Sequence, residues 1–400
     1  MERVKETKIF CKIRDNMTDP HKVYCDLVMN LNSWGHYALG MNILDLNCSF
    51  VNPRYIFLLF IMVSFLYADL ESSMLAADLE GFVFNIAMLG FGLQGFAKFD
   101  AYVYRKRDMY EVFHITTDIL IKHKKTERLN RIMIDCMSFN TMLWTFYKVL
   151  YIVVFIVLCT FGTLLTVYSG ELQLSFGFQF SFIDTTNKSG YVVTYLYQVT
   201  CIFMLVVSSY CNDMLLMVIY INALSMFDCI ISDLKELTKL SKLEKTPANK
   251  CAMTDQIKSV IKQHKDVSDY LNQSNKVFSL YFFMSLTCLT AAIAVLMIVL
   301  VWAHWYAAIF LSVLTSFQIL VLCLLGTLLL MKEEELIREV YNVTWYDLTI
   351  PDQHLLRLML LMSQHAKGIS YRFGVMNIET YVKSHKLIYS LFTMLVTTQK

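Results

Sequence analysis

A stripe of polar residues near the C-terminus has the side-chain types and the spacing to line a water-filled path. Successive members are separated by 4, 3, 4, 3 and 4 positions, which places all of them within about 40° of one line on an α-helix. The members are Glu379, Lys383, Lys386, Ser390, Thr393 and Thr397. A polar stripe on a membrane helix is costly unless it meets water or protein. The stripe therefore predicts either a pore-lining helix or a helix–helix contact in which hydroxyl groups bond across a bundle.

The two lysines of the stripe limit what such a pore could conduct. Positive charges do not suit a cation pore, so Lys383 and Lys386 would have to lie in a wide or charge-paired inner vestibule. Glu379 stands four positions before Lys383 and can form an ion pair with it. The hydroxyl groups farther along the helix would then form the wetted wall.

A second set of aromatic and small polar residues gathers in the expected outer halves of other apolar segments. A mostly apolar lining with few polar groups suits a small volatile or hydrophobic ligand. An aromatic belt at the outer membrane interface would explain some of these residues without any ligand. The candidates are Phe82, Asn85, Cys159, Gly162, Thr166, Tyr195, Gln198 and Tyr306.

The sequence offers no pattern of an enzyme site. It has no phosphate-binding loop, no His-Glu-x-x-His and no nucleophile elbow, and its 9 His are dispersed without a metal-ligand partner. The 11 Cys form no Cys-x-x-Cys pair and are expected to be buried small hydrophobic groups. We therefore expect no catalytic residue, metal or cofactor. A net charge of +2 is too small to indicate a nucleic-acid partner.

The composition is typical of a helical membrane protein. Apolar residues make up 56% of the 400 residues and charged residues 17%, against about 25% charged residues in soluble domains. The mean hydropathy is +0.48, and the chain has only 13 Gly and 4 Pro. This balance excludes a disordered chain, a disulfide-framed secreted module and an ordinary cytosolic enzyme.

Seven segments are long and apolar enough to cross a bilayer, which requires about 20 residues of helix. The expected fold is an all-α membrane protein that forms a single seven-helix domain over residues 1–400, after a cytoplasmic segment at 1–49 with no signal peptide. The spans are expected at about 50–70, 76–97, 144–168, 191–222, 279–302, 305–331 and 377–398.

The distribution of Lys and Arg predicts the orientation of these spans. Of 35 such residues, 30 lie in the N-terminal segment and in the loops on the same side, whereas only Lys188 lies in the loops on the other side. The N-terminus is therefore expected in the cytoplasm and the C-terminus outside. A seven-span metabotropic receptor would have the opposite orientation.

The cytoplasmic loops at about 98–143 and 223–278 are expected to be helical extensions. Each carries apolar residues at helical spacing, which favours a packed helical core below the membrane over a signalling surface. A short amphipathic helix is also expected at 352–373. The first face is Met109, Val112, Phe113, Thr116, Ile119 and Leu120, and the second is Ile257, Val260, Ile261, Val267 and Leu271.

Several short motifs follow one another in the C-terminal third. Cys323–Thr327 reads Cys-Leu-Leu-Gly-Thr, Glu333–Glu335 is a run of three glutamates, and Trp345–Leu348 reads Trp-Tyr-Asp-Leu. Pro351 follows, and Tyr389–Leu395 reads Tyr-Ser-Leu-Phe-Thr-Met-Leu. In this order, over about 80 residues, the motifs resemble those of the insect odorant receptors, although the proline stands later than in the family pattern.

Two related groups match less well. Gustatory receptors carry Gln-Phe five residues after a Thr-Tyr in the last span, where this chain has Leu387-Ile388 after Thr380-Tyr381; a gustatory-receptor-like channel is the alternative within this architecture. The odorant co-receptor has a longer loop between spans four and five and ends in Gln-Leu-Lys. This chain therefore resembles a ligand-selective subunit. A secondary transporter is disfavoured by the odd number of spans and the absence of internal symmetry.

The resemblance implies a heteromeric odorant-gated non-selective cation channel in the plasma membrane, assembled with the co-receptor, as a tetramer, in sensory-neuron dendrites. It implies that the seventh helices line the pore, with a constriction at Met394, Thr397 and Thr398. It also implies that the cytoplasmic extensions form the anchor between subunits. By position, the family's odorant pocket falls on Phe82, Asn85, Cys159, Gly162, Thr166, Tyr195, Gln198 and Ile202.

Overall fold

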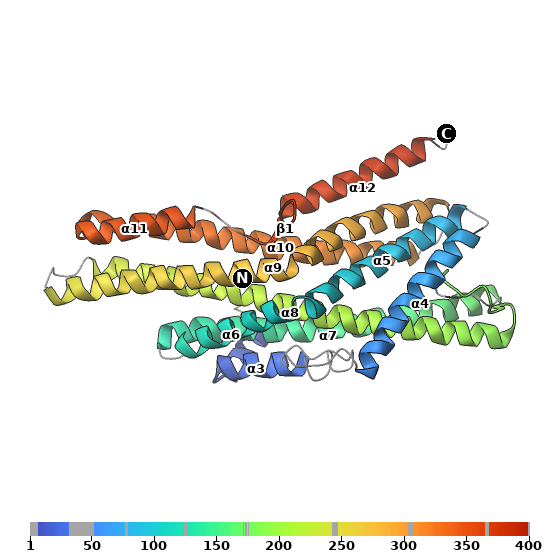
Figure 1. Ribbon diagram of the computed structural model, residues 1–400, viewed down its shortest axis with the longest axis horizontal. Coiled ribbons are helices and arrows are strands. Elements are labelled where there is room, and N and C mark those ends of the chain that lie inside the picture. Colours follow the sequence, from blue (N-terminus) through green and yellow to red (C-terminus); the bar gives the residue numbers. More distant parts are fainter. Residues whose placement is uncertain are drawn as a thin grey trace.

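The computed structural model describes residues 7–31, 52–76, 79–123, 126–170, 172, 174, 176–241, 247–302, 307–364 and 368–398. They form an elongated helical bundle whose longest helices follow the long axis (Figure 1). The elements are α2 (Lys8–Asp15), α3 (Pro20–Asn30), α4 (Pro53–Leu75), α5 (Leu79–Val103), α6 (Lys106–His123), α7 (Glu127–Ser169), α8 (Lys188–Leu240), α9 (Pro247–Trp302), α10 (Ala307–Asn342), the 3-10 turn η2 (Trp345–Asp347), α11 (Ile350–Ser363), β1 (Ser370–Tyr371), β2 (Gly374–Val375) and α12 (Ile378–Thr398).

Five helices in the described part of the chain are long and apolar enough to cross a membrane. They are α4, α7, α8, α9 and α10, which contain the first, third, fourth, fifth and sixth predicted spans. Helices α5 and α12, with 25 and 21 residues, have the length of a span and lie at the second and seventh predicted positions, but they are not among the five. The all-α membrane fold is thus confirmed, and the count of seven spans stays a prediction.

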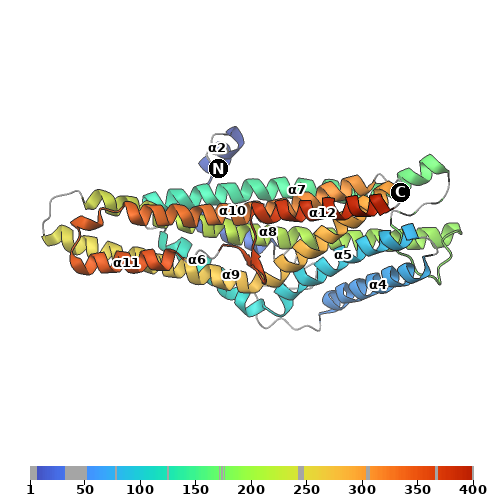
Figure 2. The ribbon, with the colours of Figure 1, turned by 90° about the horizontal axis from the view of Figure 1, so that it is seen from above.

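The long helices extend well beyond the thickness of a bilayer. Helix α9 has 56 residues, which at a rise of about 1.5 Å per residue gives a length of about 84 Å, against a hydrocarbon core of about 30 Å. Figure 1 shows α4, α5 and α12 along one half of the long axis and α6 and α11 along the other. Figure 2 shows the same division from a perpendicular direction.

The half of the bundle that holds α6 and α11 has the packed core that the apolar periodicity predicts. All six members of the predicted face between 109 and 120 are buried, as are four of the five between 257 and 271, while Ile261 is partly buried. They join one continuous core with α7 and α8. Helix α8 is the central element, because nearly all of its most apolar window is buried inside the bundle.

The helix expected at 352–373 is shorter than predicted. Helix α11 ends at Ser363, and residues 370–375 form a two-stranded antiparallel hairpin with Ser370 opposite Val375. Contacts outside the segment explain the difference, because Asn275 Nδ2 of α9 donates to the Gly368 carbonyl (2.8 Å) and the Gly368 N–H donates to the Glu333 carboxylate of α10 (3.2 Å). These long-range bonds hold the chain away from a helical path.

The start of α12 is fastened to α10 by the Gly-Thr pair of the Cys323–Thr327 motif. A Cβ atom on Gly326 would lie 2.0 Å from the carbonyl oxygen of Met376, so only glycine allows the two backbones to approach this closely. The neighbouring Thr327 hydroxyl accepts the N–H of Ile378 (2.9 Å), the first residue of α12. The motif therefore fixes where the last helix begins.

We expect Gly326→Ala to destabilise the fold, since the added methyl group collides with backbone that cannot rotate away. Overpacking of this kind costs about 1–3 kcal/mol, even though alanine is otherwise favoured over glycine inside a helix by about 1 kcal/mol. The measurement is the apparent unfolding temperature of the detergent-solubilised chain.

Gly95→Ala is the matched control for this substitution. Gly95 also lies inside a helix, and no described atom lies within 4 Å of a Cβ placed there. The control should unfold at or above the wild-type temperature. Equal behaviour of the two variants would show that the approach of Met376 to α10 does not constrain the fold.

Candidate ligand cavity and pore helix

A cavity of about 230 Å³ lies between α4, α5, α7, α8 and α10, with the chain that connects α7 to α8 at one end. Its walls are mainly Leu, Ile, Val, Met and Phe side chains. In another protein an apolar cavity of about 150 Å³ stays dry and binds benzene. The cavity here is therefore large enough for a small organic molecule of somewhat greater size.

The connection between α7 and α8 closes one end of the cavity. Gln198 of α8, which is fully buried, donates from Nε2 to the carbonyl oxygens of Phe176 (2.9 Å) and Phe178 (3.0 Å). The Phe178 ring also contacts the Phe65 ring of α4 edge to face, with centroids 5.0 Å apart. Two phenylalanine side chains are thus held across this end of the cavity by one buried amide.

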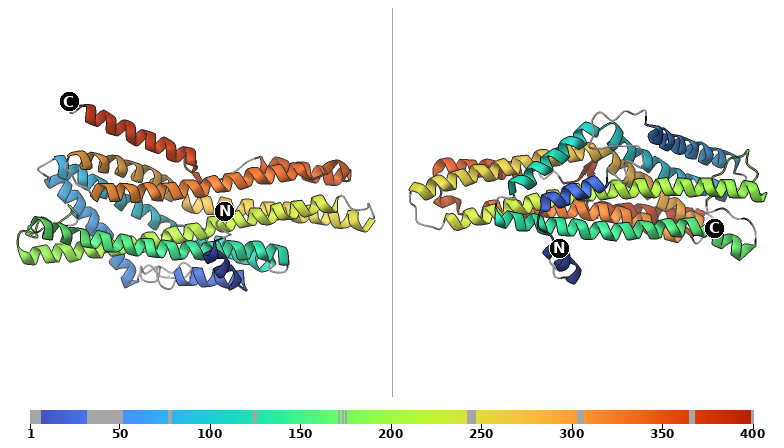
Figure 3. Two further views of the ribbon diagram at one scale, coloured as in Figure 1. Left: turned by 180° about the vertical axis from the view of Figure 1, so that it is seen from behind. Right: turned by 90° about the horizontal axis from the view of Figure 1, so that it is seen from below.

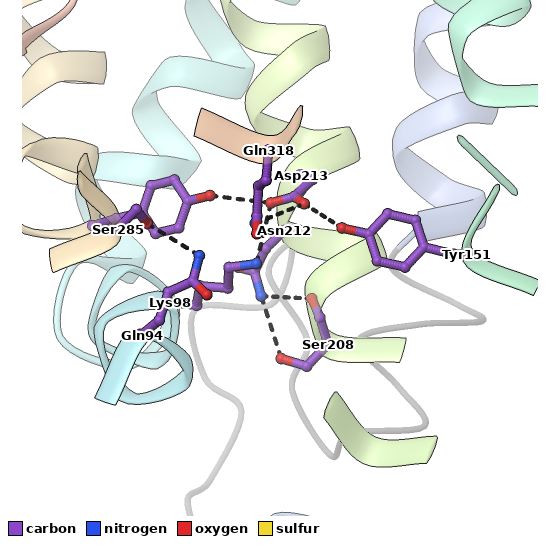
Figure 4. Close-up of polar contacts among 9 residues, drawn as sticks. Gln94, Lys98, Tyr151, Ser208, Asn212, Asp213, Ser285 and Gln318 are labelled. Atoms are coloured by element: carbon purple, nitrogen blue, oxygen red, sulfur yellow. Dashed lines mark hydrogen bonds and ion pairs between the residues drawn. The ribbon is translucent and has the colours of Figure 1, made fainter. Parts of the chain in front are cut away.

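A buried carboxylate, Asp213, lines the cavity farther along α8 from Gln198, and Figure 4 shows the polar side chains that surround it. Its Oδ1 accepts hydrogen bonds from Lys98 Nζ of α5 (3.2 Å) and from the Tyr281 hydroxyl of α9 (3.1 Å). Its Oδ2 accepts from the Tyr151 hydroxyl of α7 and from Gln318 Nε2 of α10 (3.3 Å). Side chains from four other helices therefore converge on one carboxylate.

The convergence has an electrostatic cause. Removing an ion from water costs several kcal/mol unless a countercharge and further hydrogen bonds compensate, and charged residues in membrane segments face the bundle interior for this reason. Lys98 supplies the countercharge, with only 2% of its side chain exposed. The two tyrosines and the glutamine donate hydrogen bonds to the remaining lone pairs of the carboxylate. Together the four side chains offset the cost of burying the Asp213 charge.

This network was not predicted from the sequence. Lys98 stands at the start of an expected cytoplasmic loop, whereas Asp213 lies inside the fourth predicted span, where an ionisable residue is itself a signal of a functional site. The predicted orientation of the spans is unaffected, because the bias in Lys and Arg does not depend on one residue.

The predicted ligand residues fall into groups with different surroundings. Ile202 lines the cavity, and Gln198 holds one end of it. Asn85 is buried on α5, Phe82 is largely exposed, and neither belongs to the lining residues in the described part of the chain. Tyr306 lies outside the described residues.

Four further candidates lie along the contact between α7 and α8. The Tyr195 hydroxyl donates to the Cys159 carbonyl (2.8 Å), and the Thr166 hydroxyl donates to the Gly162 carbonyl (2.9 Å). Thr166 also lies 3.2 Å from the Tyr191 hydroxyl. Among the described lining residues none of these four occurs, and the Tyr195 and Thr166 hydroxyls contribute to a helix–helix contact outside this cavity.

Helix α12 turns its polar stripe away from the rest of the chain. Ser384 and Ile388 are buried against the bundle, whereas the stripe residues, apart from the half-buried Thr393, are exposed. Glu379 and Lys383 form the predicted ion pair, with 2.8 Å between oxygen and nitrogen. Figure 3 shows α12 standing apart from the bundle. Thr398 ends the helix, and its side chain is outside the described part of the structure.

The exposed stripe bears on the helix–helix contact that the sequence left open as an alternative. A contact that buries these hydroxyl groups inside the same chain does not form among the described residues. Thr393 and Thr397 donate instead to carbonyl oxygens one turn earlier in α12, at 3.0 and 2.8 Å. A polar stripe of this kind is less costly in a membrane where it meets water or another chain.

The described residues thus form a helical membrane protein with a mostly apolar cavity between its helices. Residues 78–389 match the family described as 7tm Odorant receptor. The chain belongs to this odorant receptor family, as the motifs of its C-terminal third predict.

Similar proteins agree with this assignment. The chain is 25% identical over 244 residues to the putative odorant receptor 83c of Drosophila melanogaster, a match that covers 57% of this chain and 60% of that protein. It also has the fold of the insect olfactory receptor OR5 from Machilis hrabei, with TM-scores of 0.70 and, for the complex with eugenol, 0.69. Both structural matches cover 94% of this chain and 98% of the other at 14% identity.

We expect Lys98→Met to lower the stability of the chain strongly, because it leaves Asp213 as an uncompensated buried charge. Removing one partner of a buried pair costs about 3–5 kcal/mol. The double variant Lys98→Met, Asp213→Leu should recover part of this loss, since no charge then remains. The measurement is the apparent unfolding temperature of the solubilised chain.

Arg131→Met serves as the control for this pair. Arg131 forms an ion pair with Glu127 at 2.6 Å, but both side chains are mostly exposed, so its loss should change the unfolding temperature little. A double variant that is less stable than Lys98→Met alone would contradict charge compensation as the reason for the network.

Proposed function

We propose that this chain is the ligand-selective subunit of a heteromeric odorant-gated non-selective cation channel. Its partner would be the odorant co-receptor, and the assembly, a tetramer, would lie in the lipid of the plasma membrane of a sensory-neuron dendrite. The observation that carries the proposal is the mostly apolar cavity, which shares α10 with the contact to the exposed polar helix α12. A solved structure with the same fold is a complex with eugenol, which supports a small organic molecule as the ligand.

The cavity suits binding by the hydrophobic effect. Burial of apolar surface contributes roughly 0.8 kcal/mol per CH₂ group, so a molecule of eight to ten heavy atoms could bind with little polar contact. Any ligand that binds the open state more tightly than the closed state shifts the population toward opening. In this proposal the odorant acts by such a difference in affinity.

Helix α10 connects the cavity with α12. Leu314, Thr315, Phe317 and Gln318 line the cavity, whereas Ser316, between them, contacts α12. The Ser316 hydroxyl lies 3.0 Å from the Tyr381 hydroxyl and 2.8 Å from His385 Nε2. A ligand that displaces α10 at the cavity would therefore also displace α12, through the contact of Ser316 with Tyr381 and His385.

The polar stripe of α12 would line the pore. Equivalent helices around a central axis would place Ser390, Thr393 and Thr397 against water, with Met394 and Thr398 beside them near the outer end. The ion pair of Glu379 with Lys383 reduces the net positive charge at the inner end, where the positive-inside bias places it. The pairing offsets the charge of Lys383 but not that of Lys386, which the proposal places in a wide inner vestibule.

We expect Ile202→Trp to abolish or shift odorant responses while the protein still reaches the cell surface. Ile202 is buried and lines the cavity, so the indole would occupy the space proposed for the ligand. The measurement is the dose–response curve of the odorant-evoked current in cells that also express the co-receptor.

Phe203→Trp provides the control, because Phe203 is the next residue along α8 and 47% of it is exposed. Its responses should match those of the wild type. Wild-type curves for both variants, with every agonist, would place the ligand elsewhere in the chain.

We expect Thr397→Leu and Met394→Ala to change current amplitude or ion selectivity without loss of surface expression. Both residues are exposed on the outer part of α12, so they would alter the width and polarity of the conduction path. Leu391→Ala is the control, since Leu391 is 40% exposed but lies about 120° around the helix from Thr397. Unchanged conduction in the first two variants would remove this face from the pore.

A further inference from the structure

Two amides, Gln94 and Gln318, line the cavity. Gln94 contacts the Ser285 hydroxyl, which can donate or accept a hydrogen bond, whereas Gln318 faces a carboxylate that fixes its orientation. Gln318 lines the cavity and is half-buried. Its Nε2 lies 3.3 Å from Asp213 Oδ2, and a carboxylate paired with Lys98 can only accept hydrogen bonds. The NH₂ group of Gln318 must therefore face Asp213, which leaves the carbonyl oxygen Oε1 for other partners.

We propose that Gln318 Oε1 is the hydrogen-bond acceptor for the ligand, so that the receptor prefers small alcohols or phenols over ethers and hydrocarbons of the same skeleton. This inference rests on the proposed function, because it names the ligand class of the same cavity. The hydroxyl group of the ligand lies at the Asp213 end, and its hydrocarbon part fills the space toward Phe178.

Asp213 does not itself serve as this acceptor. Each of its two oxygens already accepts two hydrogen bonds, from Lys98, Tyr281, Tyr151 and Gln318. A carboxylate has about four lone-pair positions, so it is saturated. Its role is to position the Gln318 amide.

No described residue donates a hydrogen bond to Gln318 Oε1. Two serines of α8, Ser208 and Ser209, also line the cavity. They are the hydroxyl-bearing lining residues closest to Asp213 in the sequence. The Ser208 hydroxyl and carbonyl oxygens both receive bonds from Asn212 Nδ2, at 3.4 and 2.7 Å. The cavity therefore presents an acceptor at this end that a ligand donor can satisfy.

The consequence is selectivity by hydrogen-bond donation. A site that holds an acceptor in an otherwise apolar cavity rejects analogues that lack the donor, because the acceptor is then buried unpaired. A methyl ether carries its own lone pairs toward Gln318 Oε1 and offers no proton. A hydrocarbon of equal size fills the space but leaves the oxygen desolvated.

Matched sets of ligands test the proposal on the full chain in lipid nanodiscs. Each set contains an alcohol, its methyl ether and its parent hydrocarbon, for example 2-phenylethanol, its methyl ether and ethylbenzene, with linear and cyclic alcohols of five to nine carbons as further sets. Binding is measured by the ligand-induced rise in unfolding temperature over a concentration series. For the wild type we expect alcohols to bind at least about tenfold more tightly than the ethers.

Gln318→Met removes the acceptor and keeps the side-chain volume. We expect the preference for alcohols to fall to less than about twofold in this variant, through weaker binding of the alcohols alone. Leu314→Val, which enlarges the same wall without polar change, is the control and should weaken binding of alcohols and ethers alike.

Three outcomes would overturn the inference: alcohols and ethers that bind the wild type equally, no binding of any alcohol, or a preference that survives in folded Gln318→Met. The wild-type comparison decides the question even if the variant does not fold. Recording of co-expressing cells separates this result from the proposed function. A preference for alcohols in binding without evoked current would support the inference and contradict the channel, whereas current without that preference would do the reverse.

Discussion

The compensation of one buried carboxylate, Asp213, is the constraint on which the arrangement of the membrane helices depends. An uncompensated charge inside the bundle would cost more than most single contacts contribute, so α5, α7, α9 and α10 must each bring a polar group to α8. Beside the level at which they converge, apolar side chains of α4, α5, α7, α8 and α10 line the cavity. One end of the ligand space thus follows from an electrostatic requirement.

The same helices carry the mechanical connections of the protein. Helix α10 presents one face to the cavity and another to α12, and farther along it receives the start of α12 at Gly326 and Thr327. Glu333 of α10 and Asn275 of α9 then hold Gly368, just before the hairpin that leads to α12. The last helix therefore packs against α10, which also lines the cavity, while its polar stripe remains exposed.

Much of this structure could be predicted from local patterns in the sequence. Apolar periodicity predicted the buried faces of α6 and α9, and the 4-3 spacing predicted that the polar residues share one side of α12. Features that depend on distant residues were not predictable in this way. Lys98 and Asp213 are 115 positions apart, the hairpin at 370–375 is held by contacts with other helices, and residues such as Cys159 and Tyr195 suited a pocket but lie in a helix contact.

The measurement that tests the central claim most directly is whole-cell recording from cells that express this chain with and without the odorant co-receptor. G-protein signalling is blocked, surface expression is confirmed, and a broad odorant panel is applied. We expect a fast odorant-evoked cation current in co-expressing cells only. A response that disappears when G-protein signalling is blocked, or uptake of a ligand without current, would contradict a ligand-gated channel subunit.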